Sequence, residues 1–194
     1  MFLSEPPPSP GRADLYARDV ADDGYVSNSA RLWAWRPDVC DAFMNARKQL
    51  NAHLAPRERA LLVCAVTRAI GDSYCALAFG RQLAEHDDPA IAAAVLRGED
   101  ATGLSPRDKA LVAWARSVAR SPSDIRRGDV DALRAVGLTD QEIFDVTLFV
   151  AFRLAFSTVN DALGARPDWQ LADAVPREVR AAVTYGRPVA DREA

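Results

Sequence analysis

Long apolar runs are missing from this sequence of 194 residues. The most apolar stretches, ALLVCAV at 60–66 and LFVAF at 148–152, fall far short of the roughly 18 residues needed to cross a bilayer. An excess of positive charge is missing too, because 24 Lys and Arg stand against 27 Asp and Glu and the two signs are mixed along the chain. We therefore expect a soluble protein, with neither nucleic acid nor a membrane as its partner.

Cysteine is scarce as well. Cys40, Cys64 and Cys75 are the three cysteines, and an odd number cannot all pair within one chain. The opening segment MFLSEPPPSPGR has neither the basic region nor the apolar region of a secretion signal. These absences argue against a disulfide scaffold and favour a reducing compartment, so we expect a cytoplasmic protein.

What the sequence does contain is helical periodicity. In residues 37–50, Val39, Phe43, Ala46 and Leu50 recur at spacings of three and four and predict one apolar stripe, with Asp38 as the N-cap. Proline in the first turn predicts further helices over 56–70, 88–98 and 105–120, and the last of these begins with a capping box. A fuller capping box starts a long helix over 139–164. No stretch alternates convincingly, so the fold class is predicted to be all-α.

The chain length fits a single hydrophobic core. We expect residues 1–19 to form a flexible proline-rich lead, residues 20–168 a helical domain, and residues 169–194 a C-terminal helix near PREVRAAV followed by a loose tail. Residues 54–68 and 104–118 share six identical positions of fifteen when aligned. That similarity fits either two amphipathic helices with the same opening or a duplicated helical hairpin.

Three segments carry a resemblance to a known family: DDGYVSNSARLWAWRPDVCDAF (22–43), LAPRERALLVCAVTRAIGDSYCALAFGRQL (54–83) and AVGLTDQEIFDVTLFVAFRLAFSTVNDALG (135–164). The chain resembles the carboxymuconolactone decarboxylase / alkylhydroperoxidase D-like family, in particular its peroxidase-related branch, over most of residues 20–168. The resemblance implies an antiparallel helical bundle and, in active members, thiol-dependent reduction of hydroperoxides.

Active members carry a glutamate twelve residues before a Cys-x-x-Cys pair and a histidine four residues after the second cysteine. Cysteine and histidine four residues apart share a helix face, so the imidazole takes the thiol proton, and the first cysteine resolves the oxidised second one. This sequence keeps only Cys75, with Asp72, Phe79 and Ala60 at the other three positions. Glu58 does not replace Ala60, since two residues rotate a helix by about 200°.

Cys75 and Asp72 are nevertheless the candidate catalytic residues. A first helical turn favours a thiolate by roughly 0.3–1 kcal/mol. An ionised Asp72 about 6 Å away opposes it by somewhat under 3 kcal/mol. We therefore expect the Cys75 pKa to lie at or above the free value of about 8.5. Cys64 is a poor resolving partner, because a tight helical hairpin leaves an axial mismatch of about 4–5 Å between the two cysteines.

Other chemistry-bearing residues are few. His53 and His86 stand at expected helix ends and favour ordinary surface roles, so no metal or other cofactor is predicted. Arg153 and Asn160 interrupt the most apolar helix, where they either line a pocket, meet another subunit or are satisfied within the fold. Trp33, Trp35 and Trp114 favour core or subunit-interface packing. Long helices that are apolar on more than one face suit a homo-oligomer.

Three functions follow. One is a thiol-dependent hydroperoxidase that is weak or inactive because only Cys75 is kept, with a small hydroperoxide as its substrate. Another is a non-catalytic oligomeric scaffold or a small-molecule-binding protein. A lactone decarboxylase is the third, but it needs acid–base residues that Ala60 and Phe79 do not supply.

Overall fold

The computed structural model describes residues 1–192, and every regular element in that range is a helix. The elements are α1 (Pro10–Asp23), α2 (Asn28–Trp33), α3 (Pro37–Asn51), α4 (Pro56–Ile70), α5 (Ser73–His86), α6 (Pro89–Arg97), α7 (Pro106–Arg120), the 3-10 turn η1 (Pro122–Asp124), α8 (Arg127–Ala135), α9 (Asp140–Ala162), α10 (Trp169–Ala174) and α11 (Arg177–Ala182). The predicted all-α class is confirmed. None of these helices is long and apolar enough to cross a membrane.

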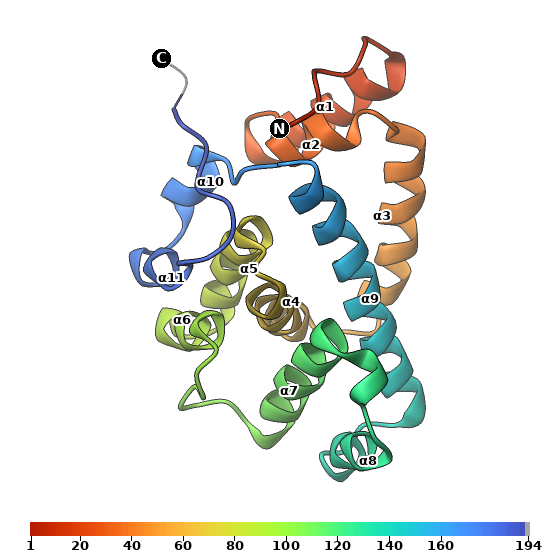
Figure 1. The fold of residues 1–194 in the computed structure, drawn as a ribbon, viewed down its shortest axis with the longest axis vertical. Helices are drawn as coiled ribbons and strands as arrows, with labels where there is room; N and C mark the ends of the chain where they lie inside the picture. The colour runs from red at the N-terminus through yellow and green to blue at the C-terminus, as the bar shows by residue number, and fades with distance from the viewer. Residues whose placement is uncertain (193–194) are drawn as a thin grey trace.

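Helix α4 is the centre of the bundle. Its residues 60–67 are all buried, which follows from the ALLVCAVT sequence, because a helix that is apolar on every side needs neighbours on every side. Those neighbours are α5, α6, α7 and α9 (Figure 1). Helix α3 packs against the outer side of α9, and α11 packs on α5 and α6.

The two helices with similar sequences, α4 and α7, pack directly on each other. Their first turns exchange ion pairs: Arg57 of α4 bonds to Asp108 of α7 at 2.7 Å, and Arg107 of α7 bonds to Glu58 of α4 at 3.1 Å. The Pro-Arg-Glu and Pro-Arg-Asp sequences therefore face each other reciprocally, as the two halves of a symmetric contact do. The repeat has a structural role at this contact.

Four details of the sequence prediction are wrong, and two of them concern α3. Helix α3 starts after Arg36 with Asp38 in its first turn, so Asp38 is not the N-cap. The inner face of α3 carries Cys40, Phe43, Met44 and Arg47, whereas Val39 is exposed, because contact with α9 selects a stripe one position further along.

The other two concern the ends of the chain. Residues 10–19 belong to α1, capped by Ser9, and are not a flexible lead. The segment after α11 is held on the bundle, since Ser73 Oγ donates to the Arg187 carbonyl at 2.7 Å and Ala190 N to the Pro167 carbonyl at 2.8 Å. Residues 193–194 of the predicted tail lie outside the described residues. The short helix near PREVRAAV is present as α11, and α10 was not predicted.

Candidate functional site

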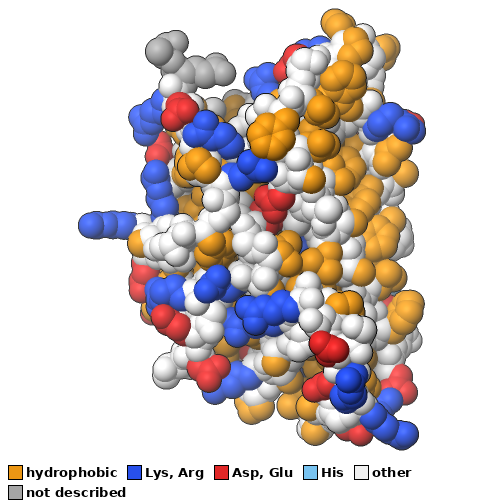
Figure 2. Space-filling view, in the orientation of Figure 1, with side chains coloured by type: hydrophobic (Ala, Val, Ile, Leu, Met, Phe, Trp, Pro, Cys, Tyr) orange, Lys and Arg blue, Asp and Glu red, His pale blue; other side chains and the backbone are white. Residues whose placement is uncertain are grey.

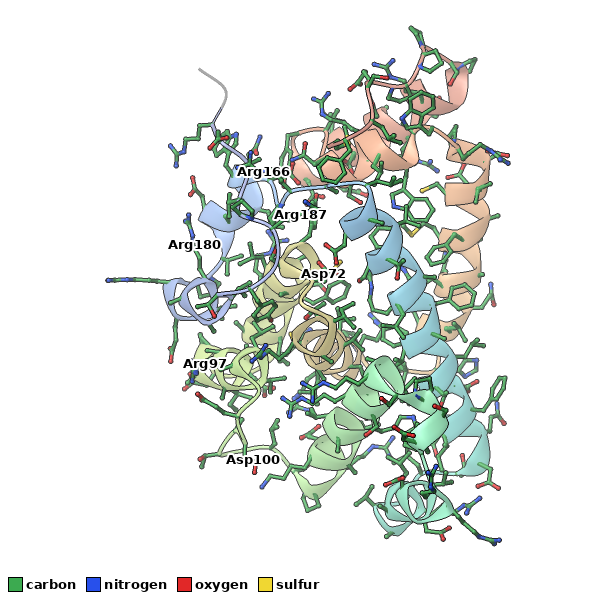
Figure 3. The ribbon with its side chains drawn as sticks, in the orientation of Figure 1. Asp72, Arg97, Asp100, Arg166, Arg180 and Arg187 are labelled. Carbon is green, nitrogen blue, oxygen red and sulfur yellow. The ribbon has the colours of Figure 1, made fainter. Side chains whose placement is uncertain are left out.

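Cys75 lies in the first turn of α5, directly after a sharp reversal of the chain. Gly71 ends α4 with a φ of 81°, a left-handed conformation that glycine adopts without strain. Asp72 then caps α5 by accepting from the Cys75 backbone N–H at 3.0 Å, as expected for an aspartate at this position. Ser157 Oγ of α9 donates to the second Asp72 oxygen at 2.6 Å. Figure 3 labels Asp72, which lies between α5 and α9. Asp72 is fully buried, so its role here is to join α5 to α9.

The Cys75 thiol favours its protonated form. Burial raises the pKa of Cys75 well above its ordinary value, the positive charge of Arg153 opposes the rise, and Asp72 adds to it. The expected direction is confirmed, but the main cause is burial, whereas the sequence argument assigned it to Asp72. Cys40, Cys64 and Cys75 are all free and buried, and burial raises the pKa of Cys64 too.

The positions that carry the proton relay in active members of the resembled family hold no base. Ala60 is inside the core, and Phe79 lies on the wall of a pocket that it does not fill. His53 and His86 are exposed at helix ends. Within residues 1–192 no group of three or more His, Cys, Asp and Glu side chains is placed to hold a metal ion. Cys75 is therefore the candidate nucleophile at this site, and the histidine and glutamate that would activate it are missing.

A pocket of about 680 Å³ opens beside Cys75. Its walls come from the α1–α2 connection and from α2, α3, α5, α9 and α10, with Tyr25, Met44 and Trp169 among the lining side chains. A smaller pocket of about 140 Å³ adjoins it, and Arg47, Phe79, Gln82 and Arg153 line both. The larger volume suits a small organic molecule.

Arg153 of α9 is the least expected part of this wall. Its side chain is 4% exposed, and its guanidinium carbon lies 4.5 Å from the centre of the Phe156 ring and 5.5 Å from that of Phe79. Nε and Nη2 are buried with no hydrogen-bond partner among the described residues. Buried guanidinium groups are usually paired, so these two donors lack the partner that such groups ordinarily have.

Arg47 of α3 adds a second positive charge. Its pKa is lowered, first by burial and then by the nearby charge of Arg153. Sequence reasoning noted Arg153 as a polar interruption of an apolar helix but missed Arg47. The signal was present, since Arg47 follows Phe43 by four residues and shares its face.

Tyr74, which lines the pocket beside Cys75, belongs to a buried hydrogen-bonded pair that the sequence did not reveal. Tyr74 donates its hydroxyl to Asp168, and Asp168 also accepts from the Asn28 backbone N–H at 2.9 Å. These bonds connect α5, the start of α2 and the turn before α10. Burial raises the pKa of Tyr74, so the phenol stays neutral and acts as a donor.

Solved structures with the same fold are known. An uncharacterised peroxidase-related protein of Ralstonia eutropha JMP134, described as an alkylhydroperoxidase AhpD core, matches with a TM-score of 0.78 and 24% identity over 88% of this chain and 93% of its own. A peroxidase-related protein of Silicibacter sp. TM1040 matches with a TM-score of 0.77 and 20% identity over the same shares of the two chains.

The debrominase Bmp8, solved as a variant with one cysteine replaced by alanine and in complex with 2,3,4-tribromopyrrole, matches with a TM-score of 0.70 and 16% identity over 94% of this chain and 97% of its own. No protein-family model matches the sequence, and no curated protein does. The chain has the alkylhydroperoxidase AhpD-core fold, and its neighbours show that this fold serves more than one activity.

Proposed function

We propose that this protein binds a small organic molecule in the pocket beside Cys75, and that any thiol-dependent reduction of hydroperoxides there is weak. The observation that carries the proposal is a pocket of about 680 Å³ with a single buried thiol on its wall, no histidine beside that thiol, and a neighbouring carboxylate, Asp72, that raises its pKa. Binding needs only the volume and the lining, both of which are present. Fast peroxide chemistry needs an ionised sulfur, which burial disfavours.

The steps of hydroperoxide reduction show which groups the pocket would need. The Cys75 sulfur attacks one peroxide oxygen, the O–O bond breaks, and a sulfenic acid and an alcohol form. Two equivalents of an external thiol then return the sulfenic acid to the thiol, giving water and a disulfide. Without a second cysteine in the pocket, the external thiol has to enter the pocket itself. Both steps are therefore slow in this arrangement.

The test is consumption of cumene hydroperoxide by the purified protein with dithiothreitol as reductant. We expect turnover close to the rate of dithiothreitol alone, and Cys75→Ser should remove any excess over that rate. Cys40→Ser is the matched control, because Cys40 is also buried but does not line the pocket. Rapid, repeated turnover that depends on Cys75 would contradict the proposal of weak peroxidase activity.

Thiol-dependent dehalogenation is a second candidate. It is favoured by the match to a debrominase that was solved with a small brominated ring, and by aromatic side chains in the pocket that also holds Cys75. In that reaction two thiols become a disulfide while an aryl bromide becomes the arene and releases bromide and a proton. Bromide release from 2,3,4-tribromopyrrole with dithiothreitol, absent in Cys75→Ser, would support it, and no release from the wild type would exclude it.

A further inference from the structure

The pocket is basic although the chain is acidic. The protein has a formal charge of -3, yet the two adjoining pockets are lined by Arg47, Arg59, Arg81 and Arg153 and by a single carboxylate, Asp23. Arg59 donates to main-chain carbonyls, and Arg81 lies near Glu85. Arg47 and Arg153 form no ion pair within residues 1–192. Among the described residues, the positive charge at this site therefore lacks a partner.

The unpaired atoms of Arg153 indicate which ligand group fits. Nε and Nη2 form one edge of the planar guanidinium, with two parallel N–H groups. Arg36 shows in this same chain what that edge binds, because its Nε and Nη2 donate to the two oxygens of Asp38 at 2.9 and 2.8 Å. Phe156 and Phe79 lie against the Arg153 guanidinium, so the in-plane edge remains for a ligand.

We propose that the pocket binds a small organic carboxylate, whose two oxygens accept from Nε and Nη2 of Arg153 and whose apolar body lies against the aromatic wall beside Cys75. Arg47 supplies the second positive charge. This inference rests on the proposed function of the pocket and names its ligand class. An inorganic anion would leave the aromatic wall and most of the 680 Å³ unused.

The first test compares acids with their neutral amides on the full-length protein at constant ionic strength. The pairs are benzoate with benzamide, phenylacetate with phenylacetamide and 2-naphthoate with 2-naphthamide, measured by thermal shift and calorimetry. We expect at least one acid to bind about tenfold more tightly than its amide, the difference that a charge-assisted bidentate pair provides. An amide that binds as tightly as its acid in every pair overturns the carboxylate inference and leaves the pocket proposal standing.

Two further results would also overturn the carboxylate inference, and the first of them would overturn the pocket proposal as well. If no compound binds at millimolar concentration, both the inference and the pocket proposal fail. If inorganic phosphate stabilises the protein as much as the best acid does, the arginines attract anions without selecting an organic carboxylate, and the inference fails.

Single substitutions test whether the Arg153 guanidinium binds the acid. Arg153→Met should weaken binding of the acid about tenfold or more and leave binding of the amide unchanged. Arg153→Lys should weaken binding of the acid less, because lysine keeps the positive charge and loses only the two parallel N–H donors. Arg36→Met is the matched control, since it removes an exposed guanidinium that does not line the pocket. Unchanged acid binding in Arg153→Met overturns the inference, and if that variant does not fold, Arg47→Gln and the wild-type comparison decide it.

Discussion

The Cys75 sulfur lies between opposing influences, and their sizes decide its state. The first turn of α5 and the charge of Arg153 favour the thiolate, whereas burial and Asp72 favour the thiol. Burial is the largest of these, because an ionised sulfur loses its hydration. A free cysteine with a pKa of about 8.5 is already mostly protonated at pH 7, and Cys75 is shifted further in the same direction.

Alkylation tests this state directly. We expect the rate of Cys75 modification by iodoacetamide to be low at neutral pH and to rise continuously as the pH is raised from 7 to 9, since the pKa of the thiol is raised. Mass spectrometry of the Cys75 peptide gives the rate, and Cys75→Ser confirms the assignment. An inflection below pH 7 would show that the thiolate is stabilised and would contradict the prediction.

Arg153 is expected to reduce stability when no ligand is bound. A buried charge without a partner costs several kcal/mol, and its two aromatic contacts return only about 0.5–2 kcal/mol each. Arg153→Met should therefore raise the free energy of unfolding by about 1 kcal/mol, as measured with urea. Arg153→Lys keeps the charge and should give no gain. A loss of stability in Arg153→Met would indicate that the guanidinium is satisfied inside the fold.

For single residues, the sequence predicted those features that depend only on neighbouring positions in the chain. Cys75 lies in the first helical turn where the sequence placed it. Ala60 and Phe79 stand at the positions where the resembled family has its glutamate and histidine, so the sequence already showed that these two groups are missing.

The spacing of Arg47 from Phe43 was a signal, but it did not decide the charge of the pocket, because that charge depends on which face of α3 meets α9. Spacings of three and four are compatible with a buried face of α3 that includes Val39 and equally with one that includes Arg47. Only the contact of α3 with α9 decides which face is buried.

At the scale of helices, Gly80 permits a close contact of α5 with its neighbours. A Cβ added at Gly80 would lie 2.7 Å from Val179 Cγ1 and 2.8 Å from Leu96 Cδ1, so α5 approaches α11 and α6 through this position. Gly80→Ala should lower the free energy of unfolding by about 1–3 kcal/mol through overpacking. Chemical denaturation measures the loss.

Gly128 of α8 is the matched control, because a Cβ there would meet nothing within 4 Å. Gly128→Ala should be neutral or raise the free energy of unfolding by up to about 1 kcal/mol, since alanine favours a helix. Equal effects of the two substitutions would show that the contact at Gly80 is not tight in solution.

The reciprocal ion pairs between α4 and α7 predict a pH dependence. Burial alone would raise the pKa of Asp108, but its bonds to Arg57 and Ser105 outweigh burial and lower it. A carboxyl group whose pKa is lower in the folded state stabilises the fold above its unfolded pKa of about 3.9, and this stabilisation is lost as the pH falls through the folded value.

Asp108→Asn should therefore lose stability at pH 7 and show a weaker further loss than the wild type when the pH is lowered below about 4. Asp131→Asn is the control, because its ion pair is exposed. Parallel pH profiles for the wild type and Asp108→Asn would contradict the assignment.

The helices were largely predictable because most of their starts are marked by the same local chemistry. Ser105 with Asp108 and Thr139 with Glu142 form the predicted capping boxes. Helix α1 begins with the same Ser-Pro pair as α7 and was missed, because the run of prolines just before it favours an extended, flexible lead. Helix α10 has only six residues, too few for a periodic pattern.

For the molecule as a whole, the surface is suited to self-association. Figure 2 shows apolar side chains gathered along the edge where α1 and α3 lie, with charges of both signs elsewhere on that face. Trp35 is 43% exposed and Val39 41%, and the ion pair of Arg18 with Asp41 holds α1 beside α3 at the same edge. A monomer gains nothing from such a patch, whereas a second copy of the chain would bury it.

We therefore expect a homo-oligomer that uses the α1–α3 edge, measured as molar mass by light scattering after size exclusion. A stable dimer buries about 800 Å² on each partner, so one charge in the centre of the contact should lower the mass to that of the monomer. Trp35→Glu should have this effect. Phe144→Glu changes another exposed aromatic residue, on α9, and should leave the mass unchanged. A monomeric mass for the wild type at every concentration would show that the apolar edge has another role.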